Sequence, residues 1–355
     1  MRILVTGGAG YIGSHTVKEL VKAGHRVTVL DNLSKGHRAA VYNAAFIQAE
    51  LADKSFLTEL LRAQKIEAVM HFAASSLVGE SMQHPAAYYQ NNVVNGLNLL
   101  EAMREAGVTY LVFSSTAAVY GEPIQTPITE DHPTLPTNPY GATKLAVEEA
   151  LAWYYRAYGL KYISLRYFNA AGADPEGDLG EDHDPETHLI PLVLKVALGQ
   201  LPAVKVFGSD YPTPDGTCIR DFIHVTDLAA AHVLALEALA GGSEPTVYNL
   251  GNGNGYSVLE VIRAAEKATG KSLPAVFTGR RPGDPAVLVA SPEKIRRELG
   301  WEPRYGDLPT MIETAWRWHQ NHPRGFGGRK VQEPGKEQNQ KEWRGALFAP
   351  ERKGN

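Results

Sequence analysis

The sequence has few of the features that mark secreted, membrane or nucleic-acid-binding proteins. It contains one cysteine, Cys218, among 355 residues, which excludes an internal disulfide and a multi-cysteine metal site. Its apolar runs fall far short of the ~20 residues that cross a bilayer. The apolar block at residues 3–6 is too short for a signal peptide. A net charge of −4 provides no electrostatic reason to expect a nucleic-acid partner. We therefore expect a soluble, cytoplasmic protein that binds neither membrane nor nucleic acid.

The composition is that of a folded protein with a distinct C-terminal segment. Hydrophobic residues make up 44% of the chain and charged residues 21%, as in ordinary globular domains. Residues 324–355 contain eight Lys/Arg and four Asp/Glu, so they carry a net charge of +4 and the preceding residues carry −8. This segment also has few aliphatic side chains to offset the entropy of ordering. We predict that residues 324–355 form a flexible basic tail.

Short apolar segments alternate with amphipathic segments along the first half of the chain. Strands are predicted at residues 3–6, 26–30, 68–73, 110–114 and 162–166. Helices are predicted between them at residues 12–23, 56–64, 93–106 and 142–158. This alternation indicates parallel βαβ units, and hence an α/β fold with a doubly wound parallel sheet of the Rossmann type.

Beyond Asn169 the regular pattern gives way to loops rich in Gly, Asp and Pro. Regular elements return at residues 189–198, 225–240, 246–250 and 258–269. Long loops in an α/β protein usually build the substrate site. We predict a dinucleotide-binding domain at 1–170, completed by about 225–250. A smaller C-terminal α/β substrate-binding lobe is predicted at 171–224 and 251–323.

A glycine-rich turn follows the first predicted strand. Gly7, Gly10 and Gly13 form the pattern G-x-x-G-x-x-G between a strand and a helix. Glycines in this context let the backbone turn tightly and approach a pyrophosphate that sits at the helix N-terminus. The turn therefore predicts a dinucleotide site.

An acidic residue ends the second predicted strand. Asp31 lies 18 residues after Gly13, where a carboxylate can bind the ribose hydroxyls of an adenosine. A negative charge there favours NAD, because it would repel the 2′-phosphate of NADP. Lys35 and Arg38 lie nearby and leave NADP as the alternative.

A tyrosine and a lysine share one face of a predicted helix. Tyr140 and Lys144 are four residues apart, and an ammonium group beside a phenol favours the phenolate. Such a pair is suited to proton transfer. Thr116 follows the strand predicted at 110–114, and the carboxyl ends of parallel strands face the cofactor crevice. Its hydroxyl can therefore bond the group on which Tyr140 acts.

These motifs, in this order along the chain, resemble those of the extended short-chain dehydrogenase/reductases. Three longer strings narrow the resemblance to the UDP-glucose 4-epimerase family within that group. They are residues 7–15 (GGAGYIGSH), 166–169 (RYFN) and 210–225 (DYPTPDGTCIRDFIHV). The resemblance extends from residue 1 to about 323 and leaves only the predicted tail uncovered.

The resemblance implies an NAD-dependent isomerase that interconverts UDP-galactose and UDP-glucose. In that family, tightly bound NAD+ takes a hydride from C4 of the sugar, and the 4-keto sugar turns and receives it on its other face. Tyr140 would be the base, Lys144 its electrostatic support and a ribose ligand, and Thr116 the hydroxyl partner. The resemblance also implies a homodimer formed through the helices predicted at 93–106 and 142–158.

The resemblance further assigns residues to the two ligands. The cofactor would be lined by Gly7, Gly10, Tyr11, Ile12, Gly13, Asp31, Asn32, Leu33, Ser34, Lys35, Gly36, Glu50, Leu51, Phe72, Ala73, Ala74, Asn91 and Phe168, together with Tyr140 and Lys144. The UDP-sugar would be held by Thr116, Asn169, His188, Leu189, Phe207, Arg220, Arg281, Asp284 and Leu288. Arg220 and Arg281 suit this assignment chemically, because a guanidinium group can bind a diphosphate through two bonds.

Several positions depart from the commoner pattern of the family. Glu50 stands where an Asp often contacts adenine, and Ser76 stands where a Lys often contacts a cofactor phosphate. His188 replaces a frequent Asn, and Phe222 replaces a frequent Tyr. Leu288 occupies a position whose size limits what fits at C2 of the sugar, and it lies between the bulky Tyr and small Cys of relatives. Acceptance of N-acetylated UDP-sugars is therefore left open.

A group of polar residues in the loop region could suggest a metal site. His183, Asp184, Glu186 and His188 fall in a proline-containing loop without the regular spacing that metal ligation prefers. We therefore predict no metal.

Four other functions are the alternatives. Another UDP-sugar epimerase, for N-acetylhexosamines, or a related sugar-nucleotide oxidoreductase would use the same frame. A 4,6-dehydratase would need an acid and a base after Thr116, where Ala117 and Ala118 cannot exchange protons. A non-catalytic NAD-binding sensor would have no need of Tyr140 together with Lys144.

Overall fold

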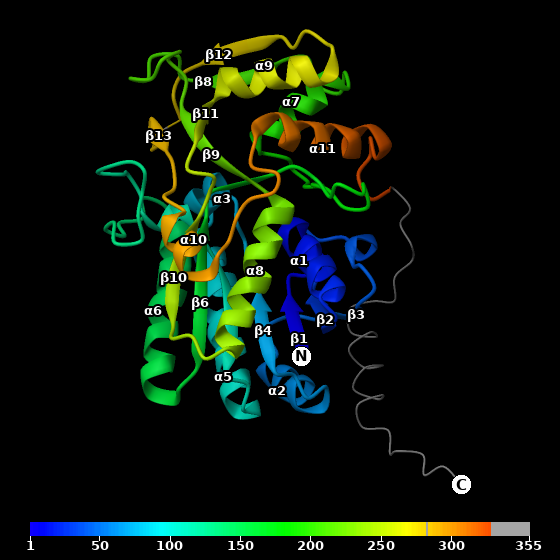
Figure 1. The fold of residues 1–355 in the computed structure, drawn as a ribbon, viewed down its shortest axis with the longest axis vertical. Coiled ribbons are helices and arrows are strands. Elements are labelled where there is room, and N and C mark those ends of the chain that lie inside the picture. The colour runs from blue at the N-terminus through cyan, green and yellow to red at the C-terminus, as the bar shows by residue number, and fades with distance from the viewer. Residues whose placement is uncertain (282, 328–355) are drawn as a thin grey trace.

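The computed structural model describes residues 1–281 and 283–327 (Figure 1). The predicted tail at 324–355 thus lies outside the described residues from residue 328 onward. The larger part of the chain is built on a seven-stranded sheet in which every paired strand is parallel. In spatial order the strands are β10 (Thr246–Leu250), β6 (Lys161–Tyr167), β5 (Tyr110–Thr116), β4 (Ala68–His71), β1 (Arg2–Thr6), β2 (Arg26–Asp31) and β3 (Ala45–Gln48).

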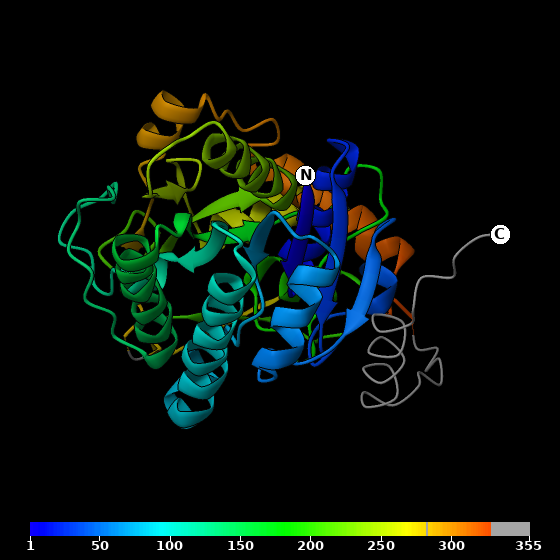
Figure 2. The same ribbon diagram turned by 90° about the horizontal axis from the view of Figure 1, so that it is seen from below.

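Helices cover both faces of this sheet (Figures 1 and 2). One face packs against α1 (Tyr11–Lys22) and α8 (Val225–Ala240). The other face packs against α2 (Lys54–Ala63), α5 (Asn95–Ala106) and α6 (Pro139–Tyr158). Alternate residues of a strand point to opposite faces. In β1, Ile3 and Val5 accordingly belong to the first core and Leu4 to the second. The doubly wound parallel sheet predicted from the sequence is confirmed.

A smaller α/β lobe follows in the later part of the chain. Its strand β9 (Ile219–His224) pairs with β7 (Asn169–Ala171), β11 (Gly255–Ser257) and β13 (Val287–Leu288). A separate parallel pair is formed by β8 (Val204–Phe207) and β12 (Ala275–Thr278). The helices α7 (Leu189–Ala197), α9 (Val258–Thr269) and α11 (Leu308–Asn321) share one apolar core with these strands. The domain boundaries predicted above stay a prediction.

Shorter elements connect the main ones. They are η1 (Arg38–Ala40), α3 (Val78–Gln83), α4 (Pro85–Tyr88), the π-helical η2 (Tyr89–Val94), η3 (Ala117–Val119) and α10 (Glu293–Leu299). None of the described helices is both long and apolar enough to span a membrane.

The start of α6 differs from the sequence prediction in a way that matters for the site. The helix was expected from residue 142 but begins at Pro139. The Oδ1 atom of Asn138 accepts a hydrogen bond of 2.9 Å from the amide of Gly141, and Pro139 occupies the first helical position. Both are established helix-start signals. Tyr140 therefore lies in the first turn of α6.

Removal of a buried side chain from α8 should destabilise the whole fold. Leu236 is fully buried in the core between α8 and the sheet. Leu236→Ala should lower the free energy of unfolding by about 2–5 kcal/mol, because it removes apolar contacts and leaves a cavity. Urea unfolding of wild type and variant measures the difference. The control Leu135→Ala, at a position that is 68% exposed, should change stability by less than about 0.5 kcal/mol. A loss below about 1 kcal/mol for Leu236→Ala would contradict the assignment of α8 to this core.

Candidate active site

The turn from β1 to α1 leaves no room for side chains at two glycines. A Cβ on Gly7 would lie 2.5 Å from the amide nitrogen of Ala73, and Gly7 has a positive φ of 74°. A Cβ on Gly13 would lie 2.2 Å from the carbonyl oxygen of Gly7. Gly10 is the N-cap of α1, and no side chain caps that helix end. The turn therefore offers backbone amides and the positive end of a helix dipole to an anion.

The carboxylate of Asp31 holds the next loop against this turn. Its Oδ2 atom accepts a 3.0 Å bond from the amide of Ala9, and its Oδ1 atom accepts a 2.8 Å bond from the amide of Leu33. Burial raises the pKa of Asp31, and the hydrogen bonds from Leu33 and Ala9 act in the opposite direction. A carboxylate has about four acceptor positions, so two amides leave capacity for ribose hydroxyls.

These features together fit a dinucleotide such as NAD. A turn closed to side chains, an uncapped helix N-terminus and an acid at the end of the next strand are the three parts that dinucleotide binding requires. The loop that follows β2 also packs closely against this turn. Asn32 donates a 3.0 Å bond to Oε2 of Glu50, and a Cβ on Gly36 would lie 2.8 Å from the carbonyl carbon of Ala9.

Lys144 is buried at the carboxyl end of β5. Its side chain is 3% exposed, and its Nζ donates a 2.7 Å bond to the carbonyl oxygen of Ser114. Burial lowers the pKa of Lys144 to about 7, and the charge of Glu148 acts against this shift. The position of its ammonium group is thus fixed by the backbone of the strand that ends in Thr116.

Tyr140 and Thr116 meet at the same strand end. The side chain of Tyr140 is buried, which raises the pKa of its phenol, and a hydrogen bond from the Thr116 side chain lowers it. The Oγ1 atom of Thr116 also accepts a 3.1 Å bond from the amide of Ala118. The structure therefore brings together the three residues that the sequence singled out for proton transfer.

A buried charge network beneath these residues was missed by sequence reasoning. Glu148, one helical turn after Lys144, pairs with Arg166 of β6 through Nη2–Oε2 and Nε–Oε1 contacts of 2.5 and 3.0 Å. Ser115 donates a 2.5 Å bond to Oε1 of Glu148. Arg166 also donates a 3.0 Å bond to the hydroxyl of Tyr120. Local spacing carries no signal for this pair, because Arg166 lies on a strand that only the tertiary fold brings beside α6.

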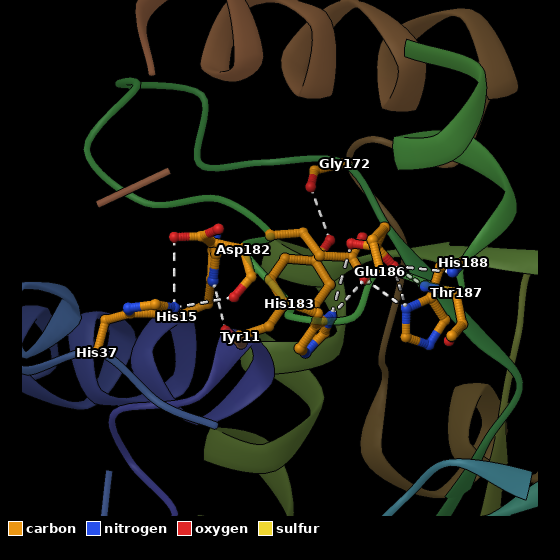
Figure 3. Close-up of polar contacts among 10 residues, drawn as sticks. Tyr11, His15, His37, Gly172, Asp182, His183, Glu186, Thr187 and His188 are labelled. Carbon is orange, nitrogen blue, oxygen red and sulfur yellow. Dashed lines mark hydrogen bonds and ion pairs between the residues drawn. The ribbon is translucent and has the colours of Figure 1, made fainter. Parts of the chain in front are cut away.

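Four other cofactor candidates lie after β1, β2 and β4 and on η2. The amide of Ala73 donates a 3.1 Å bond to the carbonyl of Thr6, and Asn91 donates a 3.1 Å bond to Oγ of Ser75. Tyr11 instead donates its hydroxyl to the carbonyl of Gly172, at 2.6 Å (Figure 3). The Nζ atom of Lys35 likewise donates a 2.7 Å bond to the carbonyl oxygen of Asp184 in the same loop. The hydroxyl of Tyr11 and the ammonium of Lys35 therefore already contact the 172–188 loop.

Most of the predicted UDP-sugar residues gather in the smaller lobe. Arg220 donates a 2.7 Å bond to Oδ1 of Asp284, and the amide of Asp284 donates to the carbonyl of Arg281 at 3.2 Å. The guanidinium of Arg281 lies 3.9 Å from the ring centre of Phe207. Leu288 is the strand partner of Arg220. Two guanidinium groups thus share one region of the lobe.

Three other predicted substrate residues lie on or beside other elements of this lobe, β7 and α7. Asn169 donates a 2.8 Å bond to the carbonyl of Asp221 and so links β7 to β9. Leu189 opens α7, and His188 precedes it. The imidazole of His188 contacts Glu181 and Glu186 and does not join the arginines.

Known proteins resemble this chain over nearly its whole length. It is 56% identical over 326 residues to a UDP-glucose 4-epimerase of Halalkalibacterium halodurans, which covers 92% of this chain and 98% of that protein. The crystal structure of UDP-glucose 4-epimerase from Brucella ovis in complex with NAD superposes with a TM-score of 0.87 at 50% identity, over 89% of this chain and 97% of that one. The structure of the Bifidobacterium longum enzyme in complex with NAD+ and UDP has a TM-score of 0.86 at 40% identity, over 92% of this chain and 100% of that one.

A family model agrees with these individual similarities. The model described as the NAD dependent epimerase/dehydratase family matches residues 3–251, which span the glycine turn, Asp31 and the Tyr140–Lys144 helix. The resemblance seen in the sequence is confirmed. This chain belongs to the NAD-dependent epimerase/dehydratase family.

Proposed function

We propose that this chain interconverts UDP-galactose and UDP-glucose by epimerisation at C4 of the sugar, and that it does so in the cytoplasm. The observation that carries the proposal is the buried group of Tyr140, Thr116 and Lys144. This group lies at the end of β5, two strands from the glycine turn that follows β1. The similarity to UDP-glucose 4-epimerases supports the substrate class.

The proposed cofactor is NAD. When bound, NAD supplies the reversible oxidation of C4, so it is regenerated in each turnover. The amides at the N-terminus of α1 would hold its pyrophosphate, and Asp31 would accept hydrogen bonds from its adenosine ribose. The bonds from Ala9 and Leu33 keep the Asp31 carboxylate in place for that contact.

The phenol oxygen of Tyr140 is proposed to take the proton of the 4-hydroxyl group and later return it. Burial alone disfavours the phenolate, because it raises the pKa of Tyr140. The hydrogen bond from Thr116 favours the phenolate instead, and so does the charge of Lys144 while its amine is protonated, below its pKa of about 7. Since Lys144 is held on the carbonyl of Ser114, its charge stays close to the reacting strand end.

The two arginines of the smaller lobe are proposed to bind the diphosphate of the UDP-sugar. Asp284 orients Arg220, and the ring of Phe207 supports Arg281. Leu288 packs with Phe168 against a small cluster that includes Tyr120, and we propose that it limits the space at C2 of the sugar. No dehydration step is proposed, because Ala117 and Ala118 of η3 carry no group that exchanges protons.

We further propose that the protein is a homodimer. Helix α6 carries two large apolar side chains at the surface, Trp153 at 64% exposure and Tyr158 at 57%. Val94, just before α5, is 43% exposed. Large exposed apolar residues are typical of protein interfaces when they gather on one face. A second copy of the chain would cover them through a two-fold, self-complementary contact.

The primary test is a conversion assay without added cofactor. Purified protein incubated with UDP-galactose should produce UDP-glucose, measured by chromatography, with no net NADH, measured by absorbance. UDP-N-acetylgalactosamine in the same assay decides whether Leu288 admits an N-acetyl group. Absence of conversion even with NAD+ supplied would overturn the proposal.

Matched tyrosine variants separate the proton transfer from folding. Tyr140→Phe should lower kcat by about 10²–10⁴-fold, since it removes the proposed proton-transfer group. Tyr155→Phe changes a tyrosine on the same helix whose hydroxyl bonds Glu244, and it should keep wild-type activity. Equal activity of the two variants would exclude Tyr140 as the base.

The buried Lys144 should make stability depend on pH. Its pKa is lowered to about 7 in the folded chain, against an ordinary value of 10.5. Between these values the unfolded chain binds the proton and the folded chain does not, so stability rises with pH. Relative to Lys144→Met, wild type should gain about 1–3 kcal/mol of unfolding free energy from pH 7 to pH 9.

Urea titrations at both pH values measure this gain. Lys267→Met, at an exposed position on α9, is the matched control and should show no such trend. A flat difference between wild type and Lys144→Met would contradict the lowered pKa.

The dimer proposal predicts a change of mass for a single substitution. Light scattering on a sizing column should find twice 38.7 kDa for wild type and 38.7 kDa for Trp153→Glu, because a buried unpaired charge opposes association. Ile124→Glu, at a 76% exposed position outside α5 and α6, should stay dimeric. A monomeric wild type would exclude the proposal.

A further inference from the structure

The loop between β7 and α7 folds four chemically related side chains onto one point. Glu181, His183, Glu186 and His188 each direct one nitrogen or oxygen to this point, and these four atoms all lie within 4.8 Å of one another. Figure 3 shows His183 and His188 directed toward Glu186, beside the ring of Tyr11. Two imidazoles and two carboxylates are a donor set that zinc accepts in proteins.

The spacing of the donor atoms matches a small coordination polyhedron. The Nδ1 atom of His188 lies 2.8 Å from Oε1 of Glu181 and 3.1 Å from Oε1 of Glu186. The Nδ1 atom of His183 lies 3.1 Å from Oε1 of Glu181 and 3.9 Å from Oε2 of Glu186. Four ligands about 2.0–2.1 Å from a tetrahedral zinc would be about 3.3–3.4 Å apart, which is within the observed range.

The two buried carboxylates of the cluster also favour a bound cation. The side chains of Glu181 and Glu186 are 5% and 2% exposed. In the described part of the chain, no lysine or arginine forms an ion pair with either carboxylate. In the metal-free chain, Glu181 and Glu186 outweigh burial and raise the pKa of His188, so its imidazolium partly neutralises them. A divalent cation would displace that proton and neutralise both carboxylates.

A neighbouring acidic group shows the contrasting case. Asp174, Glu176 and Asp178 also converge, but Nζ of Lys18 lies 2.7–2.8 Å from an oxygen of each. That group already holds its cation in the form of a buried ammonium. We therefore make no metal assignment there.

We propose that Glu181, His183, Glu186 and His188 form a structural zinc site that nothing in the proposed reaction requires. The backbone supports the arrangement, because Oε1 of Glu186 accepts bonds of 2.7 and 2.8 Å from the amides of Thr187 and His188. The sequence analysis predicted no metal because the residues lie in an irregular loop. The fold brings the four side chains together without regular spacing.

The zinc would fix the shape of a loop that touches both predicted ligand regions. Between the ligands, the carbonyl of Asp182 contacts Nε2 of His37 at 2.9 Å, and the carbonyl of Asp184 accepts the bond from Lys35. The last ligand, His188, immediately precedes α7, whose first residue is Leu189. The ion itself would bridge residues 181–188 next to the start of α7, and the contacts of Lys35 and His37 would connect that loop to the segment after β2.

Metal analysis of the untagged full-length chain tests this site directly. After incubation with one equivalent of zinc and removal of free metal, mass spectrometry should find about one zinc per chain. Cobalt substituted for zinc should produce the visible absorption bands of tetrahedral Co²⁺. Dipicolinate, a zinc chelator, should remove the metal and lower Tm. These measurements on wild type need no variant to fold.

Two variants then locate the metal. The double variant His183→Gln/His188→Gln should retain less than a tenth of the zinc and lose the cobalt bands. Asp178→Asn, in the group already held by Lys18, should bind zinc as wild type does. Wild type without zinc would show that the cluster consists of ion pairs alone. Zinc bound equally by the double variant would place the ion elsewhere, and either result overturns the proposal.

Discussion

Glu148 of α6 and Arg166 of β6 form an ion pair, and both side chains are almost completely buried. Two charges removed from water are tolerated only when each finds partners with good geometry. Here Ser115 bonds the carboxylate, and Tyr120 bonds the guanidinium. The pair thereby ties the helix that carries Tyr140 and Lys144 to the strands that carry Thr116. The position of the proposed reacting groups depends on this contact, since α6 could not shift along β5 and β6 without leaving a charge unpaired.

The last strand of the large sheet, β10, also contributes to this polar network. The sheet is not complete after β6, because β10 and α8 return from the later part of the chain to cover its edge and one face. Asn249 of β10 accepts the hydroxyl of Tyr120 at 2.6 Å, so the returning strand joins the same polar network. The chain therefore returns to the core of the larger sheet after part of the smaller lobe has been built.

The sequence predicted the parts of this structure that local physical rules govern. The strand and helix alternation, the glycine turn and the Tyr140–Lys144 spacing follow from side-chain period and backbone sterics, and the structure contains them. The four-residue strand β3 and the short strands of the smaller lobe were missed, because segments of this length carry too little periodicity. The Glu148–Arg166 pair and the cluster around His183 were not predicted because their contacts depend on tertiary folding, which local patterns do not encode.

The carboxylate of Asp31, the proposed ribose ligand, also holds two backbone segments together. It contacts the amides of Ala9 and Leu33, and Leu33 adopts a positive φ of 59° that the loop maintains. A designer who wished to convert such an enzyme to NADP by replacing this acid would also remove the clamp on which the loop depends. A substitution at this position therefore changes the cofactor preference and the loop structure together. A change of preference from NAD to NADP therefore needs a second substitution, one that supplies a new hydrogen-bond acceptor for the amides of Ala9 and Leu33.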